Sequence, residues 1–280
     1  MVKRKNEAPE NTITKKQKQM EEEKTEVEYV GRQNKDAMKD VKIKALHKTD
    51  DILIIDKPFD VHIDGKSQVT VEKLVNEQYP EMLKIGEAQL KRRKGEQERR
   101  KLKFCHQLDY ATSGVMCLAF TRRSCASVAT CFQNRTARKS YLAVVFGHIE
   151  NKNIFISAAI QEDENDLSGF KMRTTTEGGK ESETSLTVLS KGVYTFNNET
   201  RPVTKVLLKP KSGRRHQLRL HTKHIGHPIV GDATYAEDLT SPRMMLHAYR
   251  LFLPLPSGEL NIEAKDPFTN STYFNWEQDK

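Results

Sequence analysis

Residues 106–120 read HQLDYATSGVMCLAF, and this stretch decides how the rest of the chain can fold. Residues 115–120 are apolar almost without interruption, which predicts a strand buried on both faces at the centre of a sheet. Asp109 stands shortly before that strand, followed by a Thr-Ser-Gly turn. Two uses of its carboxylate stay open. It accepts hydrogen bonds from the turn N–H groups at 112–114, or it is an ionised acid at the floor of a cleft, serving as nucleophile or base.

The segments around this strand predict an α+β fold. A strand at 52–55 ends at a proline, and apolar residues at helical spacing predict a helix over 70–79. Thr121 can cap a second helix, and the alternation over 139–148 predicts a strand. Further strand-like segments occur at 154–160, 184–190, 203–209, 243–254 and 259–264. Because strands and helices do not alternate regularly, we expect a mixed, largely antiparallel central sheet with flanking helices and loops.

The charge balance favours a polyanionic partner. Lys plus Arg exceed Asp plus Glu by 47 to 38, and the isoelectric point is about 9.2. Residues 84–103 alone hold nine Lys or Arg against three Glu. We expect a basic insertion here, which is either a solvated face or an arm that contacts phosphate groups. The candidate contact residues are Arg92, Arg93, Arg99 and Arg100.

Residues 1–45 predict a disordered charged tail ahead of one domain over 46–280. Lys-Arg at 3–4 and KKQK at 15–18 loosely match a bipartite nuclear-localisation pattern, although a solvated tail accounts for them as well. The four cysteines lack C-x-x-C spacing, and no apolar run approaches the ~20 residues of a membrane helix. We therefore expect an intracellular protein of the nucleus or cytoplasm, neither secreted nor directed to mitochondria.

A second polar region, residues 211–235, reads KSGRRHQLRLHTKHIGHPIVGDATY. Its alternating part, 216–221, predicts a strand with His216 and Arg219 on opposite faces. Arg219 stands between two leucines, so we expect it to be partly buried and paired with a carboxylate, either Asp109 or another acid. The histidines here lack the spacing of a metal site, and no glycine-rich nucleotide loop occurs. The sequence therefore predicts neither a metal nor a cofactor.

Five segments in order along the chain resemble the RluA-type family of RNA pseudouridine synthases. HQLDYATSGVMCLAF resembles the family's H-R-L-D-x-x-T-S-G-L core motif. GRRHQLRLHTKHIGHPIVGDATY matches its G-R-x-H-Q-I-R-x-H-x-x-x-x-G-H-P-I-x-G-D-x-x-Y signature almost residue for residue. ILIIDKPFDVHID, RKSYLAVVFGHI and KMRTTTEGGKESETSLTVL resemble three further family segments. The matches cover roughly residues 46–255, and their shared order makes the resemblance specific.

The resemblance implies a reaction and a partner. The family isomerises uridine in RNA to pseudouridine: the base leaves C1′ through N1, turns over and rejoins C1′ through C5. Bonds are exchanged within one nucleotide, so no cofactor is implied. The implied partner is structured RNA, either rRNA or tRNA, whose target base must leave its stack. We expect a monomer, and the N-terminal tail is too short for the S4-type RNA-binding domain of many relatives.

The resemblance also implies site residues. Asp109 matches the family's essential carboxylate, Arg219 the cation that keeps it ionised, and Tyr141 the residue that lies against the flipped uracil. Gln107 departs from the family, which usually has Arg there to engage the RNA near the flipped nucleotide. A glutamine forms hydrogen bonds but cannot neutralise a phosphate. The residues expected to bind substrate are His106, Gln107, Thr112, Leu246, Arg214 and His216.

Two other functions stay open at this point. A catalytically weak relative could bind RNA as a chaperone or assembly factor, although such a protein has no need of Asp109, Tyr141 and Arg219 together. A metal-dependent nuclease would need clustered acids or ligating histidines, and the sequence pattern does not provide them. Formation of pseudouridine would distinguish an enzyme from an RNA-binding relative. Loss of activity with chelators would identify a metal-dependent nuclease.

Overall fold

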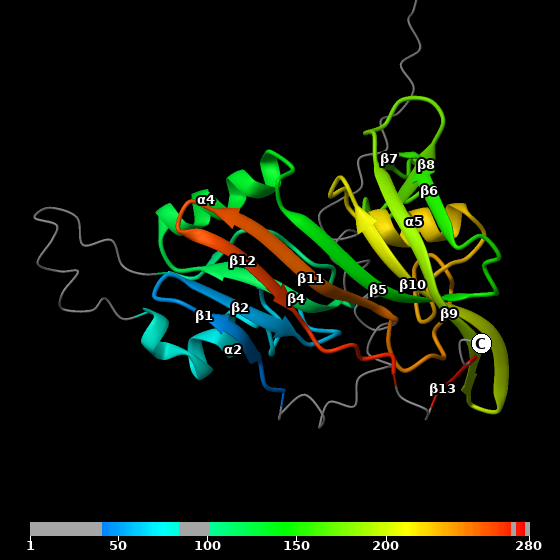
Figure 1. Cartoon of the computed structure of the whole chain (residues 1–280), viewed down its shortest axis with the longest axis horizontal. Coiled ribbons are helices and arrows are strands. Elements are labelled where there is room, and N and C mark those ends of the chain that lie inside the picture. The colour runs from blue at the N-terminus through cyan, green and yellow to red at the C-terminus, as the bar shows by residue number, and fades with distance from the viewer. Residues whose placement is uncertain (1–40, 84–100, 270–272, 278–280) are drawn as a thin grey trace, which may run out of the picture.

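The computed structural model describes residues 41–83, 101–269 and 273–277. In these ranges an 11-stranded sheet forms the centre of the molecule (Figure 1). Its strands are β1 (Lys44–Lys48), β2 (Ile52–Lys57), β3 (Lys103–Phe104), β4 (Ser113–Ala119), β5 (Arg138–Phe146), β6 (Asn153–Ser157), β9 (Glu183–Phe196), β10 (Glu199–Pro210), β11 (Leu246–Leu255), β12 (Gly258–Glu263) and β13 (Phe274–Trp276). A separate hairpin consists of β7 (Ala159–Glu162) and β8 (Met172–Thr175). The helices are α2 (Val71–Gln78), α4 (Arg122–Gln133), α5 (Gln217–His224) and the short 3-10 helix η2 (Pro80–Leu83).

The sheet is mixed and largely antiparallel, which confirms the predicted fold class. Its strand order is β1-β2-β4-β11-β5-β10-β9-β13, with β3, β6 and β12 paired at the side. Of these pairs only β4 and β11 run parallel, and their contact is limited to two residue pairs. Figure 1 shows α2 and α4 beside the half of the sheet that contains β2 and β4, and α5 beside β9 and β10.

The stretch quoted first forms β4, and all seven of its residues are buried. Met116 and Leu118 pack with α2 on one face of the sheet, whereas Val115 and Cys117 pack with α4 on the other. Both faces of the strand are therefore covered, which is why the sequence shows no alternation there. The prediction of a central buried strand is confirmed.

Two predicted helices are confirmed, and so is the predicted Thr121 cap of the second; the Thr70 cap of the first was not predicted. The Thr70 hydroxyl accepts a hydrogen bond from the Lys73 N–H (3.1 Å) at the start of α2. The Thr121 hydroxyl accepts one from the Ser124 N–H (3.1 Å) at the start of α4. Each hydroxyl satisfies an N–H group that lacks a partner in the first turn of its helix.

The prediction of a strand over 216–221 is wrong, because this segment forms helix α5. Polar–apolar alternation identifies a strand only when its polar residues face water. Here residues 217–222 are all buried, the polar ones included. The Gln217 side chain donates to the Glu183 carbonyl and the Thr184 hydroxyl, which satisfies it inside the protein. The alternation therefore reflects buried hydrogen-bonding residues.

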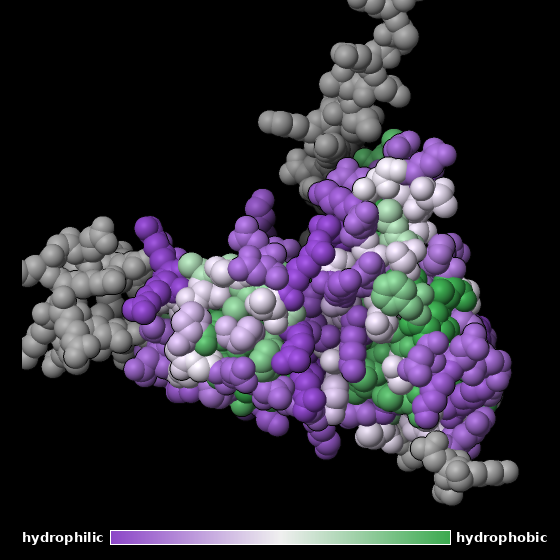
Figure 2. Space-filling model, turned by 45° about the horizontal axis from the view of Figure 1, so that its top comes forward, coloured by the Kyte–Doolittle hydropathy of each residue, from purple (hydrophilic) through white to green (hydrophobic). Residues whose placement is uncertain are grey.

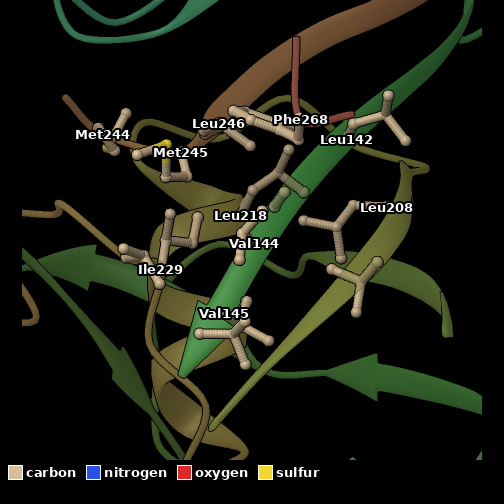
Figure 3. Close-up of a cluster of buried hydrophobic side chains, with 14 of the residues drawn as sticks. Leu142, Val144, Val145, Leu208, Leu218, Ile229, Met244, Met245, Leu246 and Phe268 are labelled. Carbon is tan, nitrogen blue, oxygen red and sulfur yellow. The ribbon is translucent and has the colours of Figure 1, made fainter. Parts of the chain in front are cut away.

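A buried cluster holds β5, β10, β11 and α5 together (Figure 3). Leu142 and Val144 of β5 meet Leu208 of β10, Leu218 of α5 and Leu246 of β11, and each of these side chains is at most 7% exposed. Burial of such a side chain stabilises the fold by roughly 1.5–3 kcal/mol. The cluster fixes α5 against the sheet, so the polar residues of α5 have defined positions.

Two predicted boundaries fall only partly on described residues. Strand β1 begins at Lys44 and Ile43 is buried, so ordered structure begins within the last residues of the segment assigned to the tail. The rest of that segment, and residues 84–100 of the basic insertion, lie outside the described residues. The division into a tail and one catalytic domain stays a proposal.

The described surface is mostly polar. Figure 2 shows hydrophilic residues over much of one face, with hydrophobic residues gathered towards the end that carries β6 and β9. Phe155 of β6 is 61% exposed and Leu189 of β9 is 40% exposed. None of the helices in the described ranges combines the length and apolar character needed to span a membrane.

We predict that Gly114→Ala destabilises the fold by at least about 2 kcal/mol. Gly114 has φ = +108°, and a Cβ there would overlap the Ala248 backbone where β4 and β11 touch. Gly213→Ala is the matched control, because its Cβ would meet only the Lys139 ammonium, at 3.7 Å. Urea unfolding followed by circular dichroism measures both variants. Equal midpoints for the two would contradict the prediction.

Candidate active site

Asp109 lies in the turn that leads into β4, and its side chain is 28% exposed. The Thr112 N–H donates to the backbone carbonyl of Asp109 (3.1 Å) and not to its carboxylate. The carboxylate instead accepts a hydrogen bond from Arg219 Nη1 to Oδ2 (3.4 Å). Of the two uses considered for this acid, the geometry supports a carboxylate that faces a cation at a partly open position.

Arg219 is a buried cation shared by two carboxylates. Its side chain is 4% exposed, and that of its second partner, Asp232, is 1% exposed. Arg219 Nε and Nη2 donate to the two carboxylate oxygens of Asp232, each at 2.7 Å. Burial alone would lower the pKa of Arg219, but the hydrogen bonds and charge of Asp232, with the charge of Asp109, raise it. The guanidinium therefore stays charged throughout the neutral range.

The two carboxylates have unequal positions. Asp232 also accepts hydrogen bonds from the N–H groups of Thr234 (2.9 Å) and Tyr235 (3.0 Å), so it is fully engaged. Asp109 has one longer contact with Arg219 and faces solvent in part. Asp232 thus anchors the guanidinium, and the Asp109 carboxylate retains hydrogen-bond acceptor sites for a substrate. Sequence reasoning left the acid partner of Arg219 open, and the Gly-Asp step of GHPIVGD was the available signal for Asp232.

Tyr141 lies on β5 between the two halves of the sheet, opposite Leu208 of β10 and Ala248 of β11. It packs against the hydrophobic clusters on both sides. The register of β11 shifts between Ala248 and Arg250, and such bulges often occur beside active sites. Burial, with the nearby Asp109 charge, raises the pKa of Tyr141. Its hydroxyl is therefore protonated at neutral pH.

Lys57 stabilises the turn that carries Asp109 through hydrogen bonds to its backbone carbonyls. The side chain is completely buried at the end of β2, and its ammonium donates to the carbonyls of Pro58 (3.0 Å), Tyr110 (2.9 Å) and Thr112 (2.9 Å). Burial lowers the pKa of Lys57, and the charges of Asp60 and Asp109 oppose that change. Sequence reasoning missed Lys57. The only signal available was a lysine two residues after the apolar run ILII.

His216 closes another side of the site. It stands directly before α5 in a left-handed conformation, with φ = +55°. A 2.7 Å hydrogen bond joins its Nδ1 to the Tyr235 hydroxyl. The same hydroxyl also accepts a hydrogen bond from the Met172 N–H (2.9 Å). Burial lowers the pKa of His216 to about 4, so the imidazole is neutral at pH 7. The Phe170 ring packs against it, with ring centroids 5.0 Å apart.

The remaining residues predicted to bind substrate have different surroundings. His106 Nε2 accepts the Cys117 N–H (2.9 Å) and its ring stacks on Phe132, contacts that orient the Asp109 turn. Thr112 is buried, and Leu246 belongs to the core cluster of Figure 3. Gln107 is exposed.

Arg214 is half-buried, and its Nε donates to the Glu181 carbonyl (3.2 Å). The structure thus brings Asp109, Arg219 and His216 close together, with Tyr141 beside the same carboxylate. Four further predicted RNA contacts lie outside the described residues, namely Arg92, Arg93, Arg99 and Arg100.

Two more histidines of the second polar region have internal hydrogen bonds. His221 bonds to the Thr184 and Ser182 hydroxyls (2.9 Å each), and His227 Nδ1 bonds to the Phe146 carbonyl (2.8 Å). Within residues 41–83, 101–269 and 273–277, no three His, Cys, Asp or Glu side chains are grouped to hold a metal. The site therefore offers a carboxylate, a fixed guanidinium and a protonated phenol as its chemical groups.

Comparison with known proteins identifies the family. The family model described as RNA pseudouridylate synthase matches residues 51–224. The chain is 36% identical over 243 residues to RNA pseudouridylate synthase domain-containing protein 1 of Danio rerio, covering 84% of this chain and 78% of the relative. It is 34% identical over 165 residues to the dual-specificity RNA pseudouridine synthase RluA of Escherichia coli strain K12, covering 58% of this chain and 71% of that one.

A solved structure agrees with these matches. The human RNA pseudouridylate synthase domain containing 1 superposes with a TM-score of 0.70 at 33% identity, over 85% of this chain and 91% of the other. Human RNA pseudouridylate synthase domain containing 4 has the same fold, with a TM-score of 0.56 at 23% identity. The chain belongs to the RNA pseudouridylate synthase family and is a pseudouridine synthase, an isomerase that modifies RNA.

Proposed function

We propose that this enzyme converts uridine to pseudouridine in structured rRNA or tRNA and that Asp109 is its essential carboxylate. The observation that carries the proposal is the contact of Asp109 with Arg219 (3.4 Å), a guanidinium that Asp232 holds at 2.7 Å. Burial without a cation would neutralise an acid, and a cation at hydrogen-bonding distance favours the ionised form that the reaction needs. The partial exposure of Asp109 makes its carboxylate accessible from solvent, as a flipped nucleotide requires.

The reaction conserves its atoms within one nucleotide. The N1–C1′ bond breaks, the uracil turns over, a C5–C1′ bond forms, and the C5 proton is lost while N1 gains one. Asp109 serves either by attacking C1′ or C6 or by removing a proton. Each of these roles requires an ionised carboxylate in a site with little water.

Tyr141 is proposed to lie against the flipped uracil ring. Acting as the base that takes the C5 proton would require its phenolate, and the raised pKa makes the phenolate scarce at neutral pH. We therefore assign Tyr141 a packing and hydrogen-bond-donating role. The proton at C5 then passes to Asp109 or to water that it orients.

RNA binding is proposed to involve the basic insertion, the half-buried Arg214 and the neighbourhood of His216. Target bases leave their stack at a cost of a few kcal/mol, which backbone contacts must offset. We also propose that the protein is a monomer and acts in the nucleus or cytoplasm. The location is supported by the composition and the tail motifs of the sequence.

We predict that Asp109→Asn abolishes isomerisation while its RNA affinity stays within a few-fold of the parent, because the amide fills the same space without the negative charge. Total RNA from cells that lack the protein is incubated with purified parent or variant, and new pseudouridines are mapped. Glu199→Gln is the control, an equivalent change in an exposed ion pair with Arg201. Sites formed by the Asp109→Asn protein would contradict the assignment.

Neutralising Arg92, Arg93, Arg99 and Arg100 to Gln is expected to lower RNA affinity and to flatten its dependence on salt. Each lost phosphate contact removes about 0.7–0.9 from the slope of log affinity against log salt concentration. Binding titrations at several KCl concentrations measure that slope. An unchanged slope would assign the segment to a solvated face.

A further inference from the structure

Arg243 is held rigidly just before β11. Its guanidinium carbon lies 4.3 Å from the centroid of the Phe59 ring, a cation–π distance. Nη2 donates to the Ser113 hydroxyl (2.6 Å), and Nε donates to the Met244 carbonyl (3.1 Å). One face and one edge of the guanidinium are thus fixed by the protein.

Among the described residues no carboxylate forms an ion pair with Arg243, and the charges of Asp60 and Asp56 act on it only from farther away. Arg219 has two carboxylates, and the Lys57 ammonium has three carbonyls, but Arg243 forms no ion pair within the described part of the chain. Burial lowers its pKa to about 10, against the charges of Asp60 and Asp56, so it is charged at pH 7. Cations removed from water are normally paired with anions, which indicates an anion supplied from outside these residues.

Arg243 also retains donors for such an anion. A guanidinium carries five N–H groups, and the hydrogen bonds that Arg243 makes use only Nε and Nη2. Nη1 makes no hydrogen bond with any described residue, so both of its N–H groups are left. The planar guanidinium geometry suits a phosphate oxygen better than an isolated halide.

The position of Arg243 ties it to the Asp109 site. Its Ser113 partner begins β4, four residues after Asp109. A Cβ at Gly231 would overlap the Arg243 carbonyl oxygen, so the backbone at Arg243 touches the residue before Asp232. Phe59, its stacking partner, is 42% exposed, so the pair reaches the surface.

We propose that Arg243, stacked on Phe59, binds a backbone phosphate of the RNA beside the target uridine. This inference rests on the proposed role of Asp109, because that role places the RNA at this loop. It also supplies a cation that the neutral, exposed Gln107 cannot provide. Phe59 positions the guanidinium, and Ser113 sets its rotation.

The probe is a single-stranded oligouridylate of about ten nucleotides, bound to the full chain carrying Asp109→Asn so that no product forms. Fluorescence anisotropy at several KCl concentrations gives affinity and salt slope. Arg243→Gln is expected to weaken binding about ten-fold and to reduce the slope by about 0.7, the value of one phosphate contact on a single strand. Arg243→Lys should keep the slope while losing a few-fold in affinity, since it keeps the charge without the planar stack.

Two further variants keep the test decisive. Arg250→Gln removes a half-exposed arginine of the same strand that pairs with Glu263 (2.9 Å), and it should bind like the parent. Phe59→Leu, at an exposed position, should weaken binding by a few-fold and keeps the proposal testable if Arg243→Gln fails to fold in a thermal melt.

An unchanged salt slope for a folded Arg243→Gln protein would overturn the inference. A lower melting temperature with an unchanged slope would do the same, and it would point to an internal acid as the partner of Arg243. The proposed function is tested separately in the protein with Asp109 intact. If uridine is converted but the salt slope of Arg243→Gln equals that of the parent, this inference alone is contradicted. If the salt slopes are as expected but no uridine is converted, the proposed function alone is contradicted.

Discussion

One buried guanidinium bridges two carboxylates, and the architecture around the site depends on that arrangement. Arg219 comes from α5, Asp232 from the loop after it, and Asp109 from the turn before β4. A charge at this depth is tolerated only when it is fully paired, so all three segments must be placed together. The core cluster of β5, β10, β11 and α5 performs that placement. The ion pair therefore depends on the hydrophobic packing around it, and the site depends on the ion pair.

Three basic side chains lie around the Asp109 turn, and each has a different environment. Arg219 is paired with acids, Lys57 is surrounded by backbone carbonyls, and Arg243 is stacked on an aromatic ring. We propose that these environments correspond to three tasks: keeping the acid ionised, shaping the turn, and meeting the negative charge of RNA. The neutral His216 and the protonated Tyr141 add hydrogen-bonding groups without adding charge.

Local sequence signals predicted the elements whose stability is local. The apolar run of β4, the apolar spacing of α2 and the Thr121 cap of α4 needed no tertiary information. Helix α5 was predicted wrongly because its polar residues are buried by partners distant in sequence. Asp109 and Arg219 were found through motif resemblance and the rule that buried arginines need acids. Asp232, Lys57 and Arg243 were missed because their roles depend on contacts across 13 to 130 residues of chain.

The rate of pseudouridine formation by Asp232→Asn tests the central claim most directly. The variant keeps Asp109 and Arg219 but removes the anchor that orients the guanidinium. Measured below its own melting temperature, kcat is expected to fall about 100-fold while KM stays within a few-fold, the loss typical of one misplaced charge-stabilising group. Its free energy of unfolding should also fall, by roughly 3–5 kcal/mol. A folded Asp232→Asn enzyme with the parent's kcat would contradict the account.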